Sequence, residues 1–155
     1  MIINNLIKEN LLQKIDNISF KQIEGRFTIA LSFLNSAKID LKKKNKDNIV
    51  IYNNIYNSIR IMGETFLLLN GYRALVKNHH KTVIEAMRKI MNIKDMDFLF
   101  DRLDRMRKNR NKLDYDIDSF DISRETLKNM LLDADVLAKK IKDFIEKSSP
   151  QEKLI

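Results

Sequence analysis

The sequence has 155 residues, enough to bury a substantial core, and its 44% hydrophobic and 32% charged residues are ordinary values for a globular protein. Three glycines and one proline favour long helices over a β-sandwich or barrel, and the lack of cysteine excludes disulfides and thiolate metal sites. We find no signal peptide and no run of about 18 apolar residues, so we expect a cytoplasmic protein without a membrane span. The net charge of +8 fits a nucleic-acid partner and equally a generally basic proteome.

Apolar residues spaced three and four apart predict five or six helices. A short N-terminal helix is expected in the opening segment, residues 2–15. The clearest apolar stripe follows, from near Ser19 to residue 41. The next helix, about residues 47–69, is apolar on two sides, which places it centrally in a bundle. Gly63 within it favours a close helix crossing, and Asn70-Gly71 is a typical helix C-terminus.

The second half of the sequence contains three more helices. They are expected over about residues 79–91 and 95–113 and, after an Asp-rich loop at 115–122, from an N-cap at Ser123 to a point before Pro150. We find no linker or internal repeat. The prediction is therefore one all-α domain over residues 1–155, an up-and-down bundle with its core at about 19–147 and a frayed C-terminal tail.

Arg110 interrupts the apolar stripe of the fifth helix. The stripe reads Leu99, Leu103, Met106, Arg110, Leu113, so a guanidinium stands where an apolar residue is expected. A buried guanidinium cannot lose its charge and needs anionic or hydrogen-bonding partners. Either Arg110 passes the rim of the core and pairs with an acidic side chain, or it faces a groove or a subunit interface and binds a phosphate.

The same helix is unusually basic around that position. Between residues 102 and 112 only Asp104 is acidic, and the basic residues are Arg102, Arg105, Arg107, Lys108, Arg110 and Lys112. A solvated basic helix explains this run in structural terms. A phosphate-binding surface explains it in functional terms, because here the charge meets the core stripe.

The stretch Arg110-Asn111-Lys112-Leu113-Asp114-Tyr115 resembles the signature of HEPN domains, in particular the small stand-alone branch whose motif ends in Arg-x-x-x-Asp-Tyr. Upstream, residues 67–72 and the segment His80-Lys81-Thr82-Val83-Ile84 resemble the second and third helices of that branch. The resemblance covers roughly residues 20–144.

The resemblance implies a bundle of four to five main helices that forms a homodimer, with the motif helices of two protomers lining one cleft. Many HEPN proteins are RNA-binding proteins or metal-independent RNases of toxin–antitoxin and defence systems, and the partner is often a minimal nucleotidyltransferase acting as antitoxin. Catalytic members carry a His four to six residues after the Arg. This chain has Tyr115, Asp116 and Ile117 instead, so the usual catalytic His is absent.

The candidate residues follow from the motif and the basic helix. Arg110 would stabilise the charge of a phosphorane, with Asp114 and Tyr115 as neighbouring groups and His80 as an auxiliary residue from another helix. Tyr115 is alternatively a site of nucleotidylation, as a nearby tyrosine is in some HEPN toxins. The expected phosphate contacts are Arg105, Arg107, Arg110, Asn111 and Lys112.

No metal or cofactor is expected. The acidic run that contains Asp114, Asp116 and Asp118 mimics an EF-hand loop, but Ser119 stands where that loop needs glycine. The adjacent His79 and His80 project about 100° apart on a helix and do not form a metal pair.

The sequence thus predicts a HEPN-like RNA- or nucleotide-binding protein, a homodimer and a component of a toxin–antitoxin or defence system. Two alternatives remain. One is a divergent metal-independent endoribonuclease toxin, and the other is a non-catalytic partner subunit of a nucleotidyltransferase.

Overall fold

The computed structural model describes residues 2–116 and 120–149. Within these ranges the chain forms six α-helices, a 3-10 turn and two short strands, which confirms the predicted all-α class. In chain order they are α1 (Ile2–Lys8), β1 (Leu12–Lys14), α2 (Phe20–Leu41), α3 (Asn48–Leu69), β2 (Tyr72–Ala74), α4 (His79–Met91), the 3-10 turn η1 (Lys94–Met96), α5 (Asp97–Tyr115) and α6 (Arg124–Lys147). None of the described helices combines the length and apolar character needed to cross a membrane.

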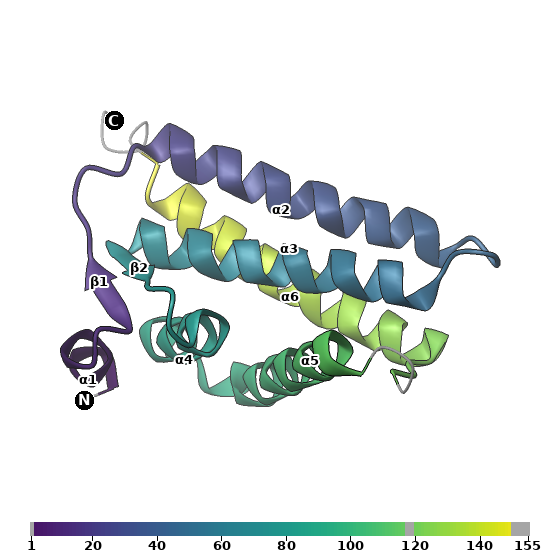
Figure 1. Cartoon of the computed structure of the whole chain (residues 1–155). Helices are drawn as coiled ribbons and strands as arrows, with labels where there is room; N and C mark the ends of the chain where they lie inside the picture. Colours follow the sequence, from purple (N-terminus) through teal and green to yellow (C-terminus); the bar gives the residue numbers. More distant parts are fainter. Residues whose placement is uncertain (1, 117–119, 150–155) are drawn as a thin grey trace.

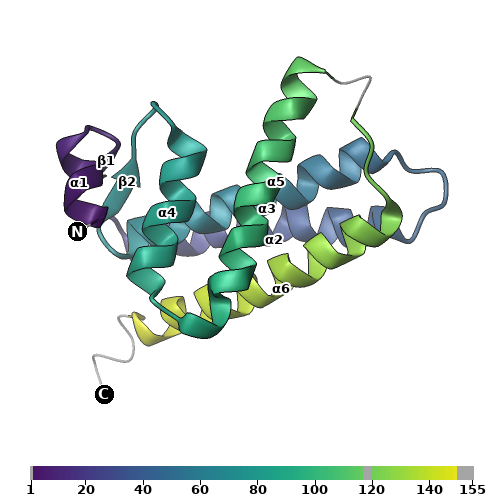
Figure 2. The same cartoon turned by 90° about the horizontal axis from the view of Figure 1, so that it is seen from below.

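Helices α2, α3 and α6 lie side by side, and α3 also contacts α4 and β2 (Figure 1). The central position predicted for α3 is therefore confirmed. The up-and-down arrangement is not: α3 and α6 run in the same direction, because α4 and α5 return the chain to the end where α3 began. These two helices cross the three long ones steeply (Figure 2).

The boundaries of the long helices follow from their caps. The Ser19 side chain accepts a hydrogen bond from the Gln22 backbone N–H, the Gln22 side chain accepts one from that of Ser19, and this capping box fixes the start of α2 as predicted. Asp47 caps α3 and Ser123 caps α6 in the same way through their side-chain oxygens.

Gly63 makes the close crossing that the sequence predicts. A methyl group at its Cα would lie 2.5 Å from Cγ1 of Val83 on α4, far inside van der Waals contact. Both apolar sides of α3 are buried, and the elements packed around it include α2, α6 and α4. The absence of a side chain at residue 63 therefore sets how closely α4, with its two histidines, approaches α3.

The two strands are absent from the sequence prediction, which treated residues 2–15 as one opening segment with a helix. The helix ends at Lys8, and β1 pairs antiparallel with β2 in the register Leu12 to Ala74. Strands of three residues are too short for the alternation of apolar and polar side chains to be recognised. Gly71, with φ of +85°, makes the turn from α3 into β2.

Helix α4 has the predicted bounds, whereas α5 is displaced by two residues at each end. The 3-10 turn η1 precedes α5, and Tyr115 is its last helical residue instead of the first residue of the loop. Asp118 and Ser119 of the EF-hand-like run lie outside the described residues, as do residues 150–155 of the predicted tail.

Candidate functional site

Arg110 is held at the edge of the core and does not project freely into solvent. Its side chain is 29% exposed, and the Nη1 group donates to the carboxylate of Asp114 one helical turn further on. Met106 and Leu113, its neighbours on the same stripe, are buried. The ion pair with Asp114 thus compensates part of the Arg110 charge. Polar groups from other helices also lie close to this guanidinium.

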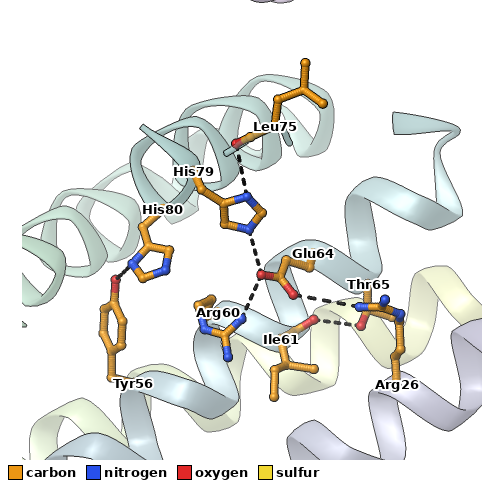
Figure 3. Close-up of polar contacts among 9 residues, drawn as sticks. All are labelled: Arg26, Tyr56, Arg60, Ile61, Glu64, Thr65, Leu75, His79 and His80. Atoms are coloured by element: carbon orange, nitrogen blue, oxygen red, sulfur yellow. Dashed lines mark hydrogen bonds and ion pairs between the residues drawn. The ribbon is translucent and has the colours of Figure 1, made fainter. Parts of the chain in front are cut away.

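A tyrosine and a histidine from two other helices meet beside Arg110. The Tyr56 hydroxyl of α3 and Nδ1 of His80 on α4 are hydrogen-bonded at 2.9 Å (Figure 3). Burial raises the pKa of Tyr56 to about 12, so the phenol keeps its proton at neutral pH. Burial, followed by the charge of Arg60, holds the pKa of His80 below 6.5, so this imidazole is neutral at pH 7.

Three guanidinium groups surround this pair. The charges of Arg107, Arg110 and Arg60 each favour the phenolate of Tyr56, in that order, although burial outweighs them. Arg60 and Arg110 also lower the pKa of His80. One phenol and one imidazole therefore lie within electrostatic range of arginines from α3 and α5, a concentration of positive charge around groups that titrate.

An open pocket lies between the start of α4 and the side of α5. We call it the α4–α5 pocket, and it is lined by Val76, Asn78, His79, His80, Lys81, Arg107 and Asn111. None of these described lining residues is acidic. Arg107 is 14% exposed, and its Nε–H donates to Asp104 at 2.9 Å, which leaves its other N–H groups for further acceptors.

Glu64 organises the groups next to this pocket. Its Oε1 accepts hydrogen bonds from Nε2 of His79 at 2.7 Å and from Nη1 of Arg60 at 2.8 Å, and Oε2 forms a longer ion pair with Arg26 (Figure 3). The carboxylate is 16% exposed. Nδ1 of His79 lies 3.2 Å from the carbonyl oxygen of Leu75, so this ring is held at both nitrogens.

The five predicted phosphate contacts divide between two sides of α5. Arg107, Arg110 and Asn111 lie towards α3 and α4. Arg105 is two residues from Arg107, which on an α-helix places it about 160° away. Lys112 lines a separate pocket with Phe120 and Thr126 at the start of α6. The structure therefore brings three of the five residues together with His80 and places two elsewhere.

The three predicted catalytic residues also lie on different sides of α5. Asp114 contacts Arg110, but Tyr115 is 91% exposed and, five residues beyond Arg110, projects about 140° away from it. Arg102, another member of the basic run, has a structural role: it makes two hydrogen bonds to Asp133 of α6, at 2.7 and 2.9 Å.

The sequence reading missed three residues of the cluster: Tyr56, Arg60 and Glu64. The ring of Tyr56 is buried on an apolar side of α3, as its residue type suggests, but its hydroxyl points to His80 (Figure 3). The signal available was the spacing of these three residues at four-residue steps on one helix, which aligns a phenol, a guanidinium and a carboxylate. Among the described residues no group of three or more His, Asp or Glu side chains is arranged to hold a metal ion.

Comparison of the chain with models of protein families finds no match, and none of the curated proteins matches it either.

Proposed function

We propose that this chain is a HEPN-like protein that binds RNA or a nucleotide through a phosphate group in the α4–α5 pocket. The observation that carries the proposal is the lining of that pocket: it presents Lys81, Arg107 and two imidazoles without an acidic residue among the described lining. Arg110 lies just behind it, in electrostatic range of His80. Guanidinium groups with free N–H donors suit phosphate oxygens, to which they donate in pairs.

The test is RNA binding by fluorescence anisotropy over a series of salt concentrations. Arg107→Ala is expected to weaken binding about tenfold and to lower the dependence of log Kd on log salt by roughly one contact. Arg110→Ala is expected to weaken binding to a similar extent. Arg105→Ala is the matched control, because it removes the same charge from the opposite side of the same helix. Equal losses in Arg105→Ala and Arg107→Ala would show that the pocket has no special part in binding.

The second candidate is a divergent metal-independent endoribonuclease, and the position of His80 favours it. A neutral imidazole beside two arginines has the groups that this chemistry needs. Nε2 of His80 would take the proton of the ribose 2′-hydroxyl while Nδ1–H donates to the Tyr56 oxygen. The 2′-oxygen would attack phosphorus, the bond to the 5′-oxygen would break and that oxygen would take a proton from water, leaving a 2′,3′-cyclic phosphate.

Incubation of the pure protein with total RNA in EDTA tests this activity. Cleavage that is lost in His80→Ala and Arg110→Ala and kept in Tyr115→Phe would establish it, since Tyr115 points away from the cluster. Intact RNA after incubation with well-folded protein would exclude the nuclease and leave the binding proposal standing.

The wider proposal follows from the resemblance: a homodimer within a toxin–antitoxin or defence system, with a nucleotidyltransferase as partner. Sedimentation analysis tests the dimer, and copurification with a nucleotidyltransferase encoded next to this chain tests the partner. A non-catalytic partner subunit is distinguished by its behaviour: it would bind that enzyme and fail to retain RNA at low salt.

A further inference from the structure

A second pocket adjoins the first. Its lining comes from α2, α3, β2 and α4, and we call it the α2–β2 pocket: Arg26, Glu64, Leu68, Arg73, Ala74 and His79. Arg26 is half exposed, with 50% of its side chain accessible. Arg73 donates to the neutral Gln13 side chain at 2.8 Å.

The charge of this pocket is positive in spite of Glu64. The carboxylate is shared among Arg26, Arg60 and His79, and its closest contacts are to the last two. Its ion pair with Arg26 is long, at 3.8 Å. Arg26 and Arg73 thus line the pocket without a close acidic partner, because Glu64 pairs at short range with Arg60 and Arg73 contacts a neutral amide.

The His79 side chain lies between the two pockets, because it lines both of them. Its two ring nitrogens face the Glu64 carboxylate and the Leu75 carbonyl oxygen, which hold the ring in place between the pockets. Figure 3 shows His80 and Tyr56 on one side of the His79 ring and Arg26 on the other. Only the thickness of one side chain therefore separates the two basic pockets.

We propose that the ligand is a single strand of RNA that crosses His79, with one phosphate in the α4–α5 pocket and a neighbouring phosphate in the α2–β2 pocket. This inference rests on the binding function proposed above and narrows its ligand from any nucleotide to a polynucleotide. A mononucleotide fills one pocket and leaves the pocket of Arg26 and Arg73 without a phosphate. A strand neutralises both pockets, and contact with successive phosphates is how proteins follow a single strand.

The experiment compares a mononucleotide with single-stranded RNA oligonucleotides of increasing length, by anisotropy and competition, at several salt concentrations. Arg26→Ala and Arg73→Ala are both exposed and are expected to leave the fold intact, as circular dichroism would show. Each is expected to weaken oligonucleotide binding threefold to tenfold, to reduce the salt dependence by roughly 0.7 of a unit and to leave mononucleotide competition unchanged. Lys139→Ala, on an exposed position of α6, is the control for loss of one positive charge.

The outcomes separate the two proposals. If Arg107→Ala weakens oligonucleotide binding while Arg26→Ala and Arg73→Ala do not, the binding function stands and the two-pocket path is wrong. If Arg107→Ala changes nothing with either ligand, the binding function itself fails. Displacement of the RNA by polyaspartate of equal charge as readily as by unlabelled RNA would identify a docking surface for acidic protein and overturn the path.

Discussion

The two faces of α3 differ in the polarity of the residues that they present. Towards α2 the contact is close and largely apolar: Ala30 and Ala37 are fully buried, and the Ser58 hydroxyl donates to the Ala30 carbonyl oxygen at 2.6 Å. Towards α4 and α5 the same helix presents two tyrosines, each with its hydroxyl hydrogen-bonded. The first face has no titratable group in these contacts, whereas the second surrounds such groups with guanidinium charges.

This difference between the two faces of α3 separates the residues that stabilise the fold from those that would bind a ligand. Burial of apolar surface stabilises the fold at about 25 cal/mol per Å², whereas a charge that is partly removed from water has to be compensated by partners. Arg110 and Arg107 are such charges, each with one acidic partner on its own helix. We therefore expect substitutions of the apolar residues between α2 and α3 to change unfolding alone, and those on the α4–α5 side to change mainly binding and titration.

The largest change in stability is expected at Gly63, where one substitution should affect both unfolding and RNA binding. Gly63→Leu forces a side chain into Val83 and Met87 and should lower the free energy of unfolding by about 3 kcal/mol, because overpacking moves helices apart. Urea denaturation measures this, and RNA binding should fall as α4 moves. Gly25→Ala is the control, because open space surrounds Gly25 and the change should stabilise α2 by about 0.5–1 kcal/mol. An unchanged midpoint in Gly63→Leu would show that the crossing is not close in solution.

The next largest effect is expected at Arg124, the residue that joins α6 to the turn between α2 and α3. Its guanidinium donates to the carbonyl oxygens of Lys43 and Lys46 at 2.9 and 2.6 Å and, at longer range, to those of Asp40 and Leu41. Arg124→Ala should cost about 2 kcal/mol of stability, since charged hydrogen bonds to carbonyl groups are lost. RNA binding at low salt should remain, and its loss in folded protein would contradict the proposed separation of stability from binding.

A smaller effect distinguishes the two tyrosines of α3. Burial raises the pKa of Tyr52 still further than that of Tyr56, and its hydroxyl donates to the Met106 carbonyl oxygen at 2.5 Å. Tyr52→Phe should therefore lower the free energy of unfolding by about 1 kcal/mol. Tyr56→Phe should have the smaller effect on unfolding and the larger effect on the titration of His80, which NMR follows directly. The reverse order would mean that the Tyr56–His80 contact is structural.

The smallest expected effect is a pH dependence of the free energy of unfolding, which comes from His80. Because its pKa in the folded protein lies below 6.5, the folded state binds this proton less readily than the unfolded chain does. The contribution of neutral His80 to stability is therefore complete above pH 6.5 and is lost as the pH falls from 6.5 through the folded-state pKa. His80→Gln should flatten stability over that range in urea titrations at successive pH values.

The same histidine reports on its neighbours. The charges that face it are those of Arg60 and Glu64 from α3, His79 from α4 and Arg110 from α5. Arg60→Ala should raise the pKa of His80 more than Arg110→Ala does, because Arg60 has the larger influence after burial. An NMR titration of the two variants measures the difference. Equal shifts would place Arg110 closer to the ring than the structure does.

The helices were predictable because their signals are local. The stripe of α2, the caps at Ser19, Asp47 and Ser123 and the glycine at the α3–α4 crossing are recognisable within a few residues of sequence. The anomaly at Arg110 was predictable for the same reason, since one charged residue in an apolar stripe breaks a period of three and four residues. Short strands and the direction of α6 carry no comparable local signal.

The sequence by itself determined that the chain is helical and that Arg110 interrupts an apolar stripe, because helix periodicity is a property of neighbouring residues. Only the tertiary structure decided which groups meet that arginine. It put Tyr56 and His80 beside Arg110, turned Arg105 and Tyr115 away from it and gathered Arg26, Arg60 and His79 on Glu64. These contacts join residues from separate helices, and the angles at which α4 and α5 cross α3 select them.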